Sequence, residues 1–75
     1  MIEEFKNLYG LNFAELSKFL ISSESKMRID VDCSPNGKVL CACLVVPDGR
    51  VYDLFFGSDD NEDFRLPLYK MRRIK

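Results

Sequence analysis

The sequence contains no histidine and no tryptophan, and neither acidic nor basic residues are in excess. Without histidine, the chain lacks Ser-His and Cys-His nucleophile pairs and the most common general base near neutral pH. Its 11 basic and 12 acidic side chains leave a net charge of −1. Such a balance gives no overall field that would attract nucleic acid or an anionic membrane. We therefore expect a protein that is not an enzyme and that uses no cofactor.

Cysteines are few, and hydrophobic runs are short. The three cysteines are an odd number, whereas small secreted disulfide scaffolds normally carry an even, spaced set. The longest apolar run, residues 39–47, is too short to cross a bilayer. The first residues also lack the basic start and apolar stretch of a secretory signal. These features predict a cytoplasmic protein that does not enter a membrane.

What is present is typical of a globular protein. Hydrophobic residues make up 47% and charged residues 31% of the 75 residues, which argues against disorder and allows one domain over residues 1–75. In the first third, apolar residues recur at spacings of three and four, which predicts helices over residues 2–9 and 12–22 or one kinked helix over residues 2–22. Asn12 and Glu15 have the spacing of a capping box at the start of the second helix.

From Met27 the apolar period changes to two, which is typical of strands. The segments 34–39 and 46–51 share the pattern x-Pro-Asn/Asp-Gly-Lys/Arg-Val, which favours three-residue hairpin loops with a glycine bulge. We therefore predict an antiparallel β-meander over residues 27–57, with strands near 27–33, 38–46 and 50–57. Residues 64–73 are predicted to form an edge strand or a short helix, because Pro67 cannot donate to a ladder. The fold class is thus α+β.

The loop lengths predict which side chains share a face of the sheet. They pair Ser34 with Lys38 and Val46 with Arg50. One face is then expected to carry Ile29, Val31, Cys33, Val39, Cys41, Cys43, Val45, Val51, Asp53 and Phe55. The opposite face is expected to carry Arg28, Asp30, Asp32, Leu40, Ala42, Leu44, Tyr52, Leu54 and Phe56. Both faces of the two later strands are largely apolar, so a face left uncovered by the helices would be an interface.

Other chemistry has simpler interpretations. We expect Cys33, Cys41 and Cys43 to pack as small buried hydrophobic residues, with a zinc site or a redox role as the alternatives. The aspartates Asp30, Asp32 and Asp53 are expected to be solvated strand residues. The acidic segment 58–63 lacks the ligand spacing of an EF-hand loop and is expected to be a solvated turn.

Two features are typical of DNA-binding proteins. Residues 10–20, Gly-Leu-Asn-Phe-Ala-Glu-Leu-Ser-Lys-Phe-Leu, resemble the first part of a repressor-type helix-turn-helix, and residues 70–75 are basic. The segment that would be the recognition helix, residues 26–32, instead alternates like a strand and carries two aspartates. A small DNA-binding regulator is therefore one alternative function, and a homodimeric structural module is another.

The preferred function is a small interaction module that occupies or blocks another protein. Proteins of this size and charge are common among the inhibitory and accessory proteins of phages and mobile elements, which is an argument by analogy alone. Aromatic and arginine side chains dominate the energetics of many interfaces. The predicted contact residues are Tyr52, Leu54, Phe56, Tyr69, Arg72 and Arg73.

Overall fold

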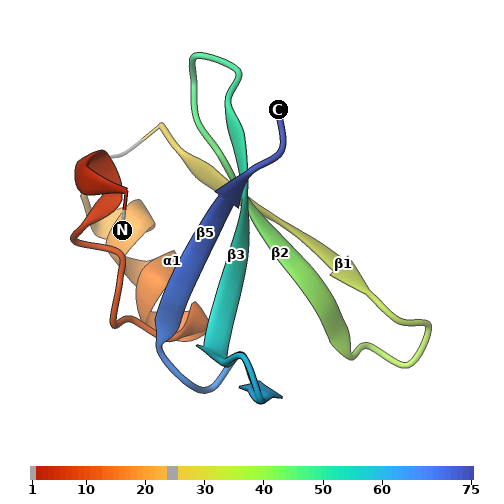
Figure 1. Cartoon of the computed structure of the whole chain (residues 1–75). Coiled ribbons are helices and arrows are strands. Elements are labelled where there is room, and N and C mark those ends of the chain that lie inside the picture. Colours follow the sequence, from red (N-terminus) through yellow and green to blue (C-terminus); the bar gives the residue numbers. More distant parts are fainter. Residues whose placement is uncertain (1, 24–25) are drawn as a thin grey trace.

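The computed structural model describes residues 2–23 and 26–75 (Figure 1). A short 3₁₀ helix, η1 (Glu3–Phe5), and an α-helix, α1 (Phe13–Ser22), precede five strands. The strands are β1 (Arg28–Cys33), β2 (Val39–Val45), β3 (Val51–Ser58), β4 (Asn61–Glu62) and β5 (Leu68–Arg73). The prediction of an α+β fold, with a helix packed on an antiparallel sheet, is confirmed.

The two predicted N-terminal helices have different outcomes. α1 begins as expected, because the Asn12 side chain accepts from the Glu15 N–H at 2.8 Å and the Glu15 carboxylate accepts from the Asn12 N–H at 3.0 Å. The predicted helix over residues 2–9 is wrong beyond the single turn of η1. At the end of that segment, the Gly10 N–H donates to the carbonyl of Leu68 in β5. A sheet contact at this point takes the place of a continued helical ladder.

The central strands form the expected meander, and both hairpin loops have three residues. The Ser34 N–H donates to the Lys38 carbonyl at 2.7 Å, and the Val46 N–H donates to the Arg50 carbonyl at 2.9 Å. Gly37 and Gly49 lie in the left-handed region, with φ of 85° and 101°, as a glycine bulge requires. The repeated Pro-Asn/Asp-Gly pattern therefore fixed both turns.

The C-terminal segment is a strand along only part of the predicted 64–73. Its pairing with β3 runs from Leu68 opposite Phe56 to Arg73 opposite Tyr52, with a bulge near Tyr69. Pro67 lies just before β5, where its missing N–H costs no ladder bond, and its carbonyl accepts from the Gly57 N–H at 2.8 Å. Within the described chain, β5 is therefore an outer strand of the order β1-β2-β3-β5, while the short β4 pairs with the end of β3.

One β-bulge changes the side-chain pattern of β1. Cys33 pairs with Val39, but the next pair is Asp32 with Cys41, so Leu40 is an extra residue on β2. Because one extra residue reverses the faces of the partner strand, Ile29 and Val31 lie on the same side as Leu44 and Ala42. The predicted faces are therefore correct for β2 and β3 and wrong for β1.

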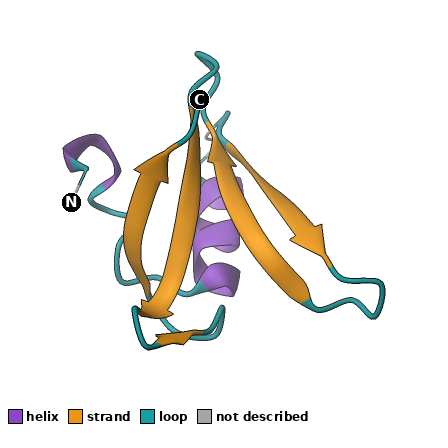
Figure 2. Cartoon of the chain, turned by 45° about the vertical axis from the view of Figure 1, so that its right-hand side comes forward, coloured by secondary structure: helices purple, strands orange, loops and turns teal. Residues whose placement is uncertain are grey.

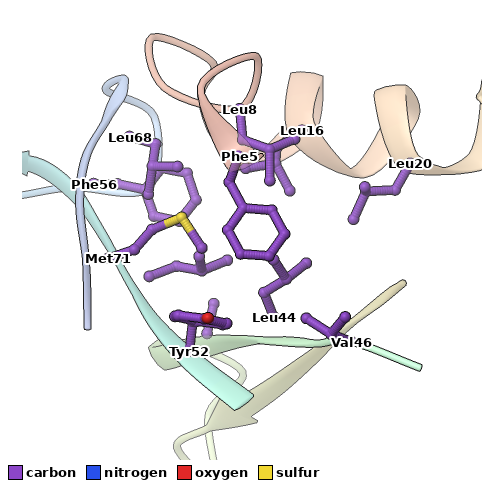
Figure 3. Packing of buried hydrophobic residues seen from close by; sticks show 12 residues of the cluster. Phe5, Leu8, Leu16, Leu20, Leu44, Val46, Tyr52, Phe56, Leu68 and Met71 are labelled. Carbon is purple, nitrogen blue, oxygen red and sulfur yellow. The ribbon is translucent and has the colours of Figure 1, made fainter. Parts of the chain in front are cut away.

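The core lies between the two helical elements and one face of the sheet (Figure 3). Leu16 and Leu20 of α1 and Phe5 of η1 pack toward Leu44 of β2 and Tyr52 of β3. The Phe5 and Tyr52 rings meet edge-to-face, with centroids 5.1 Å apart. Leu16 and Leu44 have no exposed surface.

The sheet divides at the end of the β2–β3 ladder. Those strands pair from Val45–Val51 to Ala42–Leu54 and then separate, and β4 takes the place of β2 beside the end of β3. In Figure 2 the β1–β2 hairpin diverges from β3 and β5, and α1 lies behind the strands. The opposite face of the sheet has no helix over it among the described elements.

Candidate functional site

Three of the predicted contact residues are buried in the core. Tyr52 and Leu54 are each 5% exposed and Phe56 is 2% exposed, beneath the helices. The prediction that these three side chains form a contact surface is therefore corrected. The helices cover the face that carries the larger apolar side chains, which removes the most apolar area from water.

The other three predicted residues are accessible but lie apart. The Tyr69 hydroxyl donates to Asp59 Oδ1 at 3.1 Å, beside the turn between β3 and β4. Arg72 pairs with Asp53 across the β3–β5 ladder and lies on the uncovered side of the sheet. Arg73 pairs in register with the buried Tyr52 and thus lies on the opposite side. Of the six predicted residues, Arg72 alone belongs to the site described next.

The uncovered side of the sheet, here called the open face, has an ordered composition. By strand it consists of Arg28, Asp30 and Asp32 on β1, Cys41, Cys43 and Val45 on β2, Val51, Asp53 and Phe55 on β3, and Lys70 and Arg72 on β5. One complete row across the four strands is Asp30, Cys43, Asp53 and Arg72. The outer strands thus carry the charged side chains, and the two central strands are apolar except at Asp53.

Phe55 is the largest apolar side chain of the open face. The Lys70 ammonium lies 5.2 Å and the Arg72 guanidinium 5.6 Å from its ring centroid, both within the range of a cation–π contact. Arg72 Nη2 also donates to Asp53 Oδ2 at 2.9 Å. These contacts hold the ring and both cations together at the β5 side of the open face.

The two thiols of the open face lie beside carboxylates. Cys41 Sγ lies 3.5 Å from Asp32 Oδ2, and Cys43 Sγ lies 3.3 Å from Asp53 Oδ1. Partial burial raises the pKa of the Cys43 thiol to about 11, and the Asp53 carboxylate adds to that shift. The pKa of the Cys41 thiol is raised by the same two causes. Both groups are therefore neutral near pH 7 and act as thiol donors.

The expected burial of the cysteines is wrong for two of the three residues. Cys33 and Cys41 are exposed and Cys43 is half-buried, because the helices cover the other face. Across residues 2–23 and 26–75, no three His, Cys, Asp or Glu side chains are grouped as a metal site would require.

A cavity of about 200 Å³ lies where β2 and β3 separate. Its apolar lining includes Leu40, which is 61% exposed, and Phe64, and its rim carries Glu62 and Asp63. Asp63 already pairs with Arg65 at 2.8 Å, which lowers the pKa of that carboxyl to about 2. The cavity therefore widens the accessible apolar surface next to Phe55 but presents few unpaired polar groups.

The resemblance to a helix-turn-helix does not extend beyond α1. The segment expected to correspond to a recognition helix contains β1, with Arg28 to Cys33 in strand conformation. Neither helical element of the described chain is long and apolar enough to span a bilayer.

Sequence reasoning placed Val45, Val51 and Phe55 on one face but selected the opposite face as the contact surface. The signal against that choice was Asp53, because a carboxylate in the middle of a central strand is costly to cover with a helix. Lys70 was missed because the bulge near Tyr69 sets which residues of β5 face outward. Such a bulge carries no sequence signature comparable to the Pro-Asn-Gly turns.

Comparison of the chain with known protein families, with curated proteins and with solved structures finds no match in any of the three.

Proposed function

We propose that this protein is a small non-enzymatic interaction module whose open face binds a protein surface. The observation that carries the proposal is the apolar centre of that face. An antiparallel sheet with one solvated face normally alternates apolar and polar residues along each strand. Here Cys43 and Val45 on β2, and Val51 and Phe55 on β3, put apolar side chains on the solvated side as well.

The residue types also favour a protein partner. Arginine and aromatic side chains are enriched in the energetically dominant parts of interfaces, and Phe55 and Arg72 are in contact. The cation–π contacts and the bond from Arg72 to Asp53 reduce the conformational freedom that these side chains would lose on binding. In this role the protein would occupy or block the surface that it binds.

The test compares proteins captured from the host's lysate by three tagged baits: the native chain, Phe55→Ser and Phe19→Ser. Phe19 is the matched control, because it is an exposed phenylalanine, 38% accessible, on α1 rather than on the sheet. We expect the native chain and Phe19→Ser to retain a protein that Phe55→Ser loses by tenfold or more, about the effect of a 1.4 kcal/mol contact.

Untagged copies of the chain itself, added to the lysate, count among the proteins that a bait can recover. Circular dichroism of all three baits checks that each is folded. Recovery of the same proteins in the same amounts by all three folded baits would contradict the proposal.

A further inference from the structure

The charges of the open face are arranged in an order that complements itself. Asp30 and Asp32 lie on β1 at one side, and Lys70 and Arg72 lie on β5 at the other. The apolar residues of β2 and β3 lie between these two flanks. A protein surface that fits this face needs a basic flank, an apolar centre and an acidic flank at matching strand spacings. The open face of a second copy has that order when it is turned over.

We propose that the partner of the open face is a second copy of this chain, packed sheet to sheet across a two-fold axis. The axis runs parallel to the strands and lies midway between β2 and β3. This inference rests on the proposed function, because it names the protein that the open face binds. An interface of this kind uses the same surface of both copies, which is the commonest arrangement of homodimers.

The strand register defines which residues face each other. Rotation about this axis exchanges β1 with β5 and β2 with β3 while preserving the rows. In the complete row, Asp30 of one copy then lies over Arg72 of the other. In the neighbouring row, where Val45 pairs with Val51, valine lies over valine. Sheets packed in this way lie about 10 Å apart with their strands about 30° from parallel.

The second charge pair lies on the same side of that row in both outer strands. Asp32 lies two residues after Asp30 on β1, and Lys70 lies two residues before Arg72 on β5. Because β1 and β5 run in opposite directions, both residues are displaced the same way. Asp32 of one copy therefore faces Lys70 of the other. A two-fold axis across the strands would instead put like charges together.

The size of the face indicates a reversible dimer. Four strands about 4.8 Å apart give a narrow contact, near the lower end of the area that specific interfaces bury. The two charged flanks lie at the solvent-exposed rim, so added salt should weaken the association.

Two charge-reversed variants test the arrangement. One is Asp30→Lys/Asp32→Lys, and the other is Lys70→Glu/Arg72→Gln, in which glutamine avoids placing a second carboxylate beside Asp53. Each variant alone places like charges over like charges, and an equimolar mixture restores opposite charges on both flanks. We expect the native chain to dimerise in sedimentation experiments up to about 1 mM, and each variant alone to associate at least about tenfold more weakly.

The mixture is expected to recover the dimer, with one copy of each variant in it. A mass tag on one variant identifies that mixed species. Asp60→Lys and Lys18→Asp are matched controls, since both are exposed charges outside the open face, and they should dimerise like the native chain. Recovery in the mixture also shows that both variants are folded.

A monomeric native chain throughout this range, or a mixture no better associated than the separate variants, would overturn the second-copy inference. The proposed function has a separate outcome. If the chain is monomeric but Phe55→Ser still loses a different protein from the lysate, the interaction module stands and its partner is not a second copy. If neither experiment depends on the open face, both proposals fail.

Discussion

At the scale of single residues, the open face combines apolar and polar groups that neutralise one another. Asp53 is the one carboxylate on its central strands, and it accepts from both Arg72 and the Cys43 thiol. A half-buried aspartate between two donors keeps its charge without remaining fully hydrated. The central part of the face can therefore be covered by a protein surface at a lower desolvation cost than an isolated carboxylate would impose.

The Cys43 thiol should be unusually slow to react with alkylating reagents. Alkylation requires the thiolate, and a rise in pKa from 9.0 to about 11 reduces the thiolate fraction at pH 8 by about 100-fold. We expect Cys43 to be alkylated about 100-fold more slowly in the folded chain than in the chain unfolded by urea. Mass spectrometry of timed samples, resolved by peptide, measures this ratio. The rate should rise with pH until about pH 11, since the thiolate is the form favoured above the pKa.

The variant Asp53→Asn separates the two causes of this shift. Burial is the larger cause and remains, whereas the carboxylate that stabilises the protonated thiol is removed. Alkylation of Cys43 should therefore become faster than in the native chain but stay slower than in urea. An unchanged rate in Asp53→Asn would show that the carboxylate does not influence the thiol.

At the scale of elements, local sequence signals were reliable where a backbone conformation has a specific residue requirement. The loops at Asn36-Gly37 and Asp48-Gly49 have the predicted length, and α1 has the predicted capping box. The bulge at Leu40 has no such signal, because any residue can occupy it. That one extra residue moves Asp30 and Asp32 onto the open face, so the acidic flank could not be derived from turn chemistry alone.

Gly57 is the glycine whose replacement should most disturb the fold. It has φ of 98°, and a Cβ at this position would lie 2.2 Å from the Asn61 carbonyl oxygen, which belongs to the backbone. Gly57→Ala should therefore displace β4 and lower the free energy of unfolding by more than 2 kcal/mol, about the upper range of backbone strain without a clash. Gly37→Ala is the control, because its φ is also positive but its Cβ would meet nothing within 4 Å.

Urea unfolding followed by circular dichroism measures both variants. Gly37→Ala should lose about 1 kcal/mol, the cost of the left-handed conformation alone. The expectation for Gly57 is refuted if the two alanine variants have the same midpoint and slope.

At the scale of the whole molecule, the choice of which face the helix covers could not be derived from periodicity. Both faces of β2 and β3 are largely apolar, so the alternation of residues permits either arrangement. Size and charge decide between them. The covered face carries Tyr52, Leu54 and Phe56, whereas the open face carries smaller side chains and the charged Asp53. The chain thus forms its core from the larger residues and leaves outside the face that carries charges.

A chain of 75 residues has little stability to lose. At about 0.05 to 0.15 kcal/mol per residue, its free energy of unfolding is expected to be about 4 to 11 kcal/mol. Leu44 is fully buried under the helix and faces away from the proposed interface. Leu44→Ala should therefore cost about 2 to 5 kcal/mol by leaving a cavity in the core.

Leu40 provides the comparison for this prediction. It lies on the same strand but is 61% exposed, because the bulge places it beyond the helix. Leu40→Ala should change the free energy of unfolding by about 0.5 kcal/mol or less, as is usual for surface positions. Urea unfolding of both variants at one low protein concentration keeps association from contributing to the comparison. If Leu40→Ala were as destabilising as Leu44→Ala, the core would have to extend past the point where β2 and β3 separate, and the covered face described for the helix would be too small.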